Sequence, residues 1–168
     1  IAEVFDFPSF QLVKNAPTVK AFKIPTADLG DKTFVDAICQ VGKPIFIGVG
    51  GASMKEIDAI FDQASVYGVD ITLLHGIQNF PTRLEDSLLK KIQLLRQRYN
   101  CKVGFADHID AEDSEMANIL PAMAVAAGAT VIEKHINMNR SKKDLDYYSS
   151  LNPDEFKSFV KLIKKIST

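Results

Sequence analysis

The chain has 168 residues, 46% of them hydrophobic, which is enough for one globular domain with a substantial core. Its 20 basic and 21 acidic residues give a net charge of −1 without a block of one sign, which argues against a nucleic-acid or membrane surface. No apolar stretch approaches the ~20 residues of a membrane span, and we see no secretory signal. Two cysteines without CxxC spacing indicate free thiols, so we expect a cytoplasmic protein.

Short apolar runs recur along the chain and predict β-strands. They cover residues 2–7, 20–24, 44–49, 70–75, 102–106 and 130–136. Between them lie amphipathic stretches, of which residues 84–99 follow a 3.6-residue period and predict one helix. Residues 117–127 predict a helix rich in small residues, and the last helix follows residue 152.

Three of these stretches begin with a capping signal, in which a small polar residue stands three positions before a glutamate. The pairs are Ser53 with Glu56, Thr82 with Glu85, and Asn152 with Glu155.

Strand follows strand at intervals of about 20 to 30 residues, which is typical of a barrel built from βα units. A doubly wound sheet is the competitor, but it usually carries a GxGxxG turn, and Gly48-Val49-Gly50-Gly51 lacks that spacing. We therefore expect an α/β TIM-type (β/α)8 barrel in which residues 1–168 form a single partial domain, with about six of the eight βα units.

All three histidines follow a predicted strand: His75, His108 and His135. Parallel α/β barrels place their chemistry at the carboxyl ends of their strands, so these imidazoles are expected at one rim. Residues two apart share a face of a strand, so Glu133 and His135 point the same way. Imidazole binds first-row divalent metals, which makes His108 and His135 a candidate metal pair, with Glu133 and Asp107 as possible oxygen ligands. The alternative is that each histidine only bonds to loop carbonyls.

Lys23 lies in another predicted strand, and Thr26 and Asp28 follow on its rim. A lysine inside a barrel needs an anion, which a substrate phosphate or carboxylate would supply. The alternatives are a salt bridge within the barrel, for example with Glu133, and a Schiff-base lysine.

Two loops carry further polar and aromatic residues. Gln78, Asn79 and Phe80 follow His75 and suit contacts with a sugar or a carboxylate. Asp144 and Asp146 follow the last predicted strand and are expected to overhang the same mouth. Residues of this kind also occur in loops for turn formation alone.

Several segments, in this order, resemble the sialic acid (N-acetylneuraminate) synthase family over residues 4–159. The motifs that carry the resemblance are Phe22-Lys23-Ile24-x-Thr26-x-Asp28, Gly42-Lys43-Pro44-Ile45, Leu73-Leu74-His75 with Phe80-Pro81-Thr82, Gly104-x-x-Asp107-His108, Ile132-Glu133-Lys134-His135, and Asp146 ahead of Ser150-Leu151-Asn152-Pro153-Asp154-Glu155-Phe156. Arg140-Ser141-Lys142-Lys143 resembles the branch of the spore-coat polysaccharide biosynthesis proteins.

The resemblance implies a condensation of phosphoenolpyruvate with an N-acetylmannosamine-like amino sugar, dependent on a divalent metal, with Mn²⁺ expected and Mg²⁺ or Co²⁺ as alternatives. It also implies a homodimer. The implied roles are metal binding by His108 and His135; catalysis by Lys23, Asp28 and Glu133; and substrate binding by Lys23, Thr26, His75, Gln78, Phe80 and Asp146.

Some features depart from the family pattern. Ala106 and Gly48 replace expected serines, and a lost hydrogen bond to a charged group is worth roughly 1.5–3 kcal/mol. The first two βα units and the antifreeze-like C-terminal domain have no counterpart here, so an inactive isolated chain is one expectation. Two other readings stay open: another metal-assisted aldol or isomerase reaction, and a non-catalytic sugar- or anion-binding module.

Overall fold

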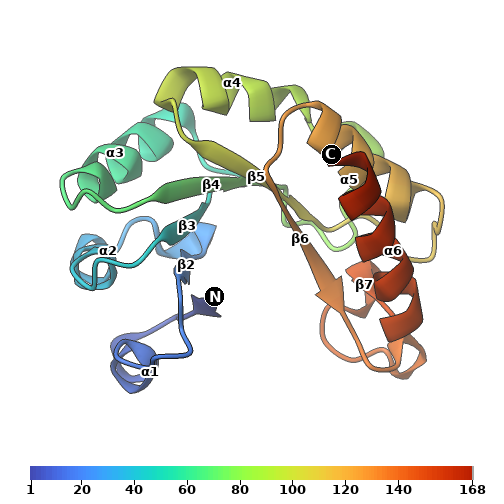
Figure 1. The fold of residues 1–168 in the computed structure, drawn as a ribbon, viewed down its shortest axis with the longest axis horizontal. Helices are drawn as coiled ribbons and strands as arrows, with labels where there is room; N and C mark the ends of the chain where they lie inside the picture. The colour runs from blue at the N-terminus through green and yellow to red at the C-terminus, as the bar shows by residue number, and fades with distance from the viewer. Residues whose placement is uncertain (168) are drawn as a thin grey trace. The chain divides into compact units, whose positions relative to one another are not determined.

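The computed structural model describes residues 1–167. The chain divides into two compact units, Ile1–Leu74 and His75–Thr168, and each is described by itself. In both units short strands alternate with helices along the chain, as the colour sequence of Figure 1 shows. None of the described helices is long and apolar enough to cross a membrane.

The first unit is a run of parallel strands, each followed by a helix. Its elements are β1 (Ala2–Glu3), α1 (Phe7–Val13), β2 (Phe22–Ile24), η1 (Thr26–Asp28), α2 (Lys32–Cys39), β3 (Ile45–Gly48), α3 (Met54–Ser65) and β4 (Ile71–His75), whose last residue opens the second unit. The strands pair in chain order, and the register aligns Ala2, Phe22, Ile45 and Ile71.

One face of this sheet forms the core of the first unit. Phe22, Ile45 and Leu73 are fully buried. Phe10 of α1 packs edge-on against Phe22 with ring centroids 5.6 Å apart, which shows that α1 covers this face at β2. The apolar residues of the strands therefore hold the sheet and helices together, and alternation turns Lys23 to the opposite face.

The second unit contains the remaining elements. They are η2 (Leu84–Asp86), α4 (Lys90–Tyr99), β5 (Lys102–Asp107), α5 (Met116–Ala126), β6 (Val131–Ile136), η3 (Arg140–Lys142), η4 (Tyr147–Ser149), β7 (Ser150–Leu151) and α6 (Pro153–Ile166). β5, β6 and β7 pair in parallel, and α5 and α6 lie side by side (Figure 1).

The parallel α/β class is confirmed, and every predicted strand region contains a strand, but the count of about six βα units is not. The described residues form seven strands, because β7 is only two residues long and carries no apolar run that the sequence could reveal. The first strand ends at Glu3 rather than residue 7, since Asp6 caps α1 by accepting a hydrogen bond from the Ser9 amide at 2.7 Å.

The prediction of one helix over residues 84–99 is wrong. A 3-10 turn occupies Leu84–Asp86, Leu88 has a positive φ of 45°, and α4 begins only at Lys90. The expected cap at Thr82 is also absent, because its hydroxyl donates to the carbonyls of Ile77 and Asn79 instead. The other two capping boxes, at Ser53 and Asn152, are present.

Gly76 permits a close backbone approach that a side chain would block. A Cβ at this position would lie 2.0 Å from the carbonyl oxygen of Ala106 on β5. We expect Gly76→Ala to lower the free energy of unfolding by about 1–3 kcal/mol or more, because a backbone atom must move. Urea denaturation measures this loss.

Gly30→Ala is the matched control, since a Cβ there meets nothing within 4 Å and its φ is not positive. Equal stability of the two variants would show that the backbones at Gly76 and Ala106 can separate without loss.

Candidate functional site

The carboxyl ends of β5 and β6 bring two histidines together. The register pairs Ala106 with Glu133 and Asp107 with Lys134, so one further residue brings His108 level with His135. Their ring centroids are 5.1 Å apart and the rings are tilted by 52°. The expectation that these two imidazoles converge is therefore confirmed.

The two ring nitrogens of His135 have different surroundings. Its Nδ1 lies 3.7 Å from Oδ2 of Asp146, at ion-pair distance. Its Nε2 is buried and has no hydrogen-bond partner among the described residues. A carboxylate beside one nitrogen and an unused second nitrogen is the arrangement of a metal-binding histidine with a supporting acid.

The backbone of His108 anchors two loops at the strand end. Its carbonyl oxygen accepts hydrogen bonds from the Thr82 amide and the Ser149 hydroxyl, both at 2.8 Å. The loop after β4 and the segment before β7 are thereby tied to the same point. The Ser150 hydroxyl in turn donates to the Asp146 carbonyl at 2.8 Å, which stabilises the loop that presents Asp146.

Phe80 lies against the histidine pair. Its ring is nearly perpendicular to both imidazoles, with centroids 5.1 Å from His108 and 6.3 Å from His135. The side chain is also exposed, so one part of the ring remains open to a ligand. Its expected contact with a sugar stays a prediction, and the structure adds a contact with the histidines that the sequence did not indicate.

Asp107 and Lys134 form a buried ion pair on the opposite face of the same two strands. Their side chains are 0% and 1% exposed. Asp107 also accepts a hydrogen bond from the Ile109 amide at 3.1 Å. Removing one partner of such a pair would leave an uncompensated buried charge. The carboxylate of Asp107 is thus occupied, and it is not available as the metal ligand that we considered.

The histidine pair fits a divalent metal that takes few ligands from the protein. Within residues 1–167, no group of three or more His, Cys, Asp or Glu side chains gathers as a metal cage. Two imidazoles leave most positions of an octahedral ion to water or substrate, as in open catalytic sites, whereas a structural zinc site would need four. Glu133 lies on the same face of β6 as His135.

Lys23 forms a salt bridge, as one of our alternatives expected, but with a partner that we did not consider. Its Nζ lies 3.2 Å from Oε1 of Glu3 on the neighbouring strand, and the Lys23 side chain is largely buried. The register explains the pair, since Glu3 and Lys23 are directly opposite each other.

Thr26 and Asp28 lie in the turn after β2. A Cβ on Gly48 would approach the backbone nitrogen and Oγ1 of Thr26 to 3.1 Å, so the space for the expected serine hydroxyl is narrow here. Oδ2 of Asp28 is buried without a hydrogen-bond partner among the described residues. Burial, and then the charge of Asp31, raise the pKa of the Asp28 carboxyl above its ordinary value.

His75 is a core residue in this structure. Its ring is 0% exposed, and its Nε2 donates to the carbonyl of Ser87 at 2.9 Å. Gln78, three residues on, is exposed. The substrate contacts that we expect at His75 and Gln78 stay predictions, and for His75 the structure shows a packing role.

Comparison with known proteins agrees with these motifs. A family model described as the NeuB family matches residues 1–168. Pseudaminic acid synthase of Campylobacter jejuni (serotype O:2) is 34% identical over 148 residues, which cover 86% of this chain and 41% of that protein. The chain spans 41 to 47% of the length of this and similar curated relatives.

Solved structures share the fold over nearly the whole chain. N-acetylneuraminic acid (sialic acid) synthetase from Leptospira borgpetersenii, crystallised with citrate, has a TM-score of 0.90 and 28% identity, covering 99% of this chain and 56% of that one. A spore coat polysaccharide biosynthesis protein from Bacillus subtilis has a TM-score of 0.89 and 26% identity, covering 99% and 45%. The resemblance stated from the motifs is confirmed, and so is the TIM-barrel-like α/β class.

We expect the stability of the fold to fall in mild acid because of His75. Burial lowers the pKa of this imidazole below its ordinary value of 6.5. As the pH falls below about 6.5, the unfolded chain takes up a proton that the folded chain resists, so folding loses up to about 1.4 kcal/mol per pH unit. Urea denaturation between pH 7.5 and 5 measures the slope.

His75→Gln keeps a donor for the Ser87 carbonyl and removes the titration, so its slope should be shallower. Identical slopes for the two proteins would contradict the assignment to His75.

Proposed function

Because the chain belongs to the NeuB family, we propose that its protein condenses phosphoenolpyruvate with an N-acetylmannosamine-like amino sugar in a metal-dependent reaction. The product would be a sialic-acid-type nonulosonate. The observation that carries this proposal is the contact between the His108 and His135 rings at two adjacent strand ends. We place the reaction in the cytoplasm, on a homodimer of the whole protein.

The metal, Mn²⁺ or alternatively Mg²⁺ or Co²⁺, would be held by His108 and His135. When bound, it would supply Lewis-acid polarisation of the aldehyde oxygen and orient the acceptor. Asp146 would keep the His135 ring in place from its Nδ1 side, where the carboxylate already lies at ion-pair distance.

Phosphoenolpyruvate would be bound by Lys23, Thr26 and Gln78. The ammonium group of Lys23 is held between strands by Glu3, so it is positioned before the substrate arrives. Such a preorganised charge offsets the negative charge of the donor without reorganisation during the reaction.

Asp28 and Glu133 would handle protons. Burial, the chief cause, raises the pKa of Asp28, so its carboxyl is a better proton acceptor than an ordinary aspartate. Glu133 lies on the same strand face as His135, which supports a role beside the aldehyde.

The acceptor sugar would contact Asp146 and Phe80. Asp146 has a positive φ of 57° in a loop tied to β7, and Phe80 offers an exposed aromatic ring beside the histidines. A carboxylate that accepts from sugar hydroxyls, next to a ring that packs on the apolar sugar face, suits a carbohydrate.

The reaction balances with water as the third reactant. C3 of phosphoenolpyruvate forms a bond to the aldehyde carbon, and the aldehyde oxygen takes up a proton to become a hydroxyl. Water adds at C2, and the bond from C2 to the phosphate oxygen breaks to release inorganic phosphate.

We expect His108→Ala and His135→Ala each to weaken Mn²⁺ binding by roughly 100-fold or more, because each removes one of two protein ligands. Calorimetric titration of the full-length protein measures the affinity. Asp146→Asn should weaken binding by about 10- to 100-fold, and the control is Met138→Ala, an exposed residue three positions beyond His135. Unchanged affinity in both histidine variants would show that the metal assignment is wrong.

We expect the full-length protein to release phosphate from phosphoenolpyruvate only when an amino-sugar acceptor is present, since carbon–carbon bond formation must precede loss of phosphate. A phosphate assay with and without N-acetylmannosamine-type acceptors measures this coupling. Turnover with a different donor would favour another aldol reaction, and sugar-acid binding without turnover would favour a binding module.

A further inference from the structure

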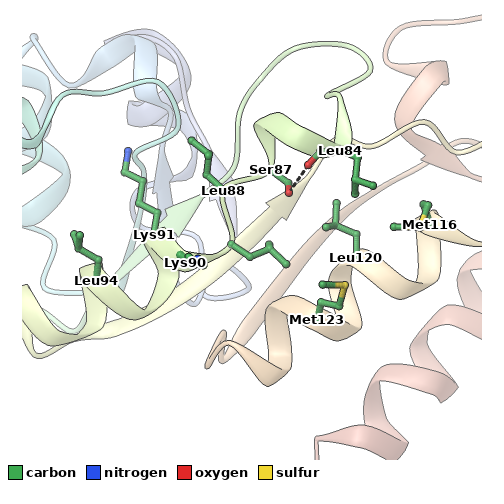
Figure 2. A pocket seen from close by; sticks show the side chains of 10 residues that line it. Leu84, Ser87, Leu88, Lys90, Lys91, Leu94, Met116, Leu120 and Met123 are labelled. Carbon is green, nitrogen blue, oxygen red and sulfur yellow. Dashed lines mark hydrogen bonds between the residues drawn. The ribbon is translucent and has the colours of Figure 1, made fainter.

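The second unit has an apolar groove on its helical side, and none of the candidate site residues lines it. The groove has a volume of about 670 Å³. Leu120 and Met123 project from α5 toward the 3-10 turn η2 and α4, and Leu84 faces Leu120 (Figure 2). The residues that line it are Leu84, Ser87, Leu88, Leu89, Lys90, Lys91, Leu94, Met116, Leu120 and Met123.

The apolar walls of the groove are open to solvent. Leu84, Leu88, Leu94 and Met123 are each between 47 and 56% exposed. Single exposed leucines are ordinary, but several around one groove form a contiguous patch, and such patches mark binding surfaces. Leucine and methionine side chains are also flexible enough to adapt to a partner.

Leu88 is held in a backbone conformation that leucine rarely adopts, with φ of 45°. The residue before it is fixed twice: the Ser87 carbonyl accepts from buried His75, and the Ser87 hydroxyl donates to the Leu84 carbonyl at 2.7 Å (Figure 2). The hydrogen bonds of Ser87 thus hold exposed Leu88 in an unfavourable backbone conformation at the groove. Residues in such strained conformations are frequent at functional sites.

The charge on the two helical walls is unequal. α4 contains Lys90, Lys91, Arg96 and Arg98 and no acidic residue, whereas α5 contains no charged residue. The Arg96 side chain extends to the turn after α5 and lies against Gly128. A Cβ at position 128 would be only 2.2 Å from the Nη1 atom of Arg96.

The acidic residues of η2, next to the groove, already have a basic partner. Glu85 and Asp86 of η2 each form an ion pair with Arg83 at 3.1 Å. Asp113, ahead of α5, accepts a hydrogen bond from the Met116 amide. The α4 side of the groove is therefore positive, and an occupant with negative charge on that side would complement it.

We propose that this groove binds an amphipathic helix of a partner protein, with apolar residues at i, i+3, i+4 and i+7 and acidic residues along the flank that faces α4. A groove bounded by two helices takes the apolar face of a third helix. The basic residues of α4 then set the orientation of that helix and speed its association.

The test uses the full-length protein and a synthetic amphipathic peptide of about 18 residues, long enough to form a helix. Its apolar face carries leucine and its flanks carry glutamate; a matched peptide carries lysine in place of glutamate. We expect the acidic peptide to bind at least about tenfold more tightly than the basic one, and its affinity to fall with added salt. Fluorescence anisotropy measures both.

Leu88→Asn is the informative variant, because asparagine accepts a positive φ and the fold should not suffer. It should weaken binding of the acidic peptide by about tenfold, and so should Met123→Glu. Lys90→Glu should reduce the preference for the acidic peptide. The control is Leu12→Asn, at an exposed leucine of α1 outside the groove, and it should bind as the unchanged protein does.

Three outcomes of the peptide titrations would overturn the proposal, and a fourth comes from a lipid competition. The first three are equal affinity for the two peptides, binding that Leu88→Asn does not weaken, and no binding to either peptide. Vesicles of phosphatidylglycerol provide the last comparison: if they bind through the same residues and displace the peptide completely, an anionic lipid surface is the occupant instead.

Discussion

The parallel register of β5 and β6 is the constraint on which the candidate site depends. Because Asp107 lies opposite Lys134, the next residues, His108 and His135, must lie side by side on the other face. The buried ion pair resists a slip by one residue, since a slip would separate Asp107 from Lys134 and bury both charges without compensation. The ion pair of Asp107 and Lys134 on one face of the strands therefore positions the two imidazoles on the other face.

The loops around the histidines extend this constraint to the residues that would meet a substrate. The His108 carbonyl accepts from both Thr82 and Ser149, so the loops that carry Phe80 and Asp146 are tied to the same strand end. The histidine pair, an acid beside it and an aromatic ring are held by backbone hydrogen bonds. This arrangement keeps the site ordered before any ligand arrives, which is what efficient transition-state stabilisation requires.

His75 connects the strand ends to the helical side of the same unit. Its buried ring binds the Ser87 carbonyl, and Ser87 in turn holds the segment that presents Leu88 at the apolar groove. His75 follows a strand, as the candidate site histidines do, but its ring stabilises the segment that forms the apolar groove. The histidine pair lies at the ends of β5 and β6, whereas the groove is lined by η2, α4 and α5 and the segment between η2 and α4. The two surfaces have opposite chemistry, since the groove is apolar with a basic flank and the histidine pair is polar with an acid beside it.

The sequence by itself determined the alternation of strands and helices and two of three helix caps, because these depend on local periodicity or on residues a few positions apart. The order of its motifs indicated the family, and histidines at the ends of successive predicted strands indicated the pair. The sequence did not show β7, the break at Leu88, the Glu3–Lys23 salt bridge or the ion pair of Asp107. These features depend on which residues meet across strands and loops. Only the tertiary structure decides such contacts, since the register, the positive φ of Leu88 and the burial of His75 arise from packing between segments far apart in the chain.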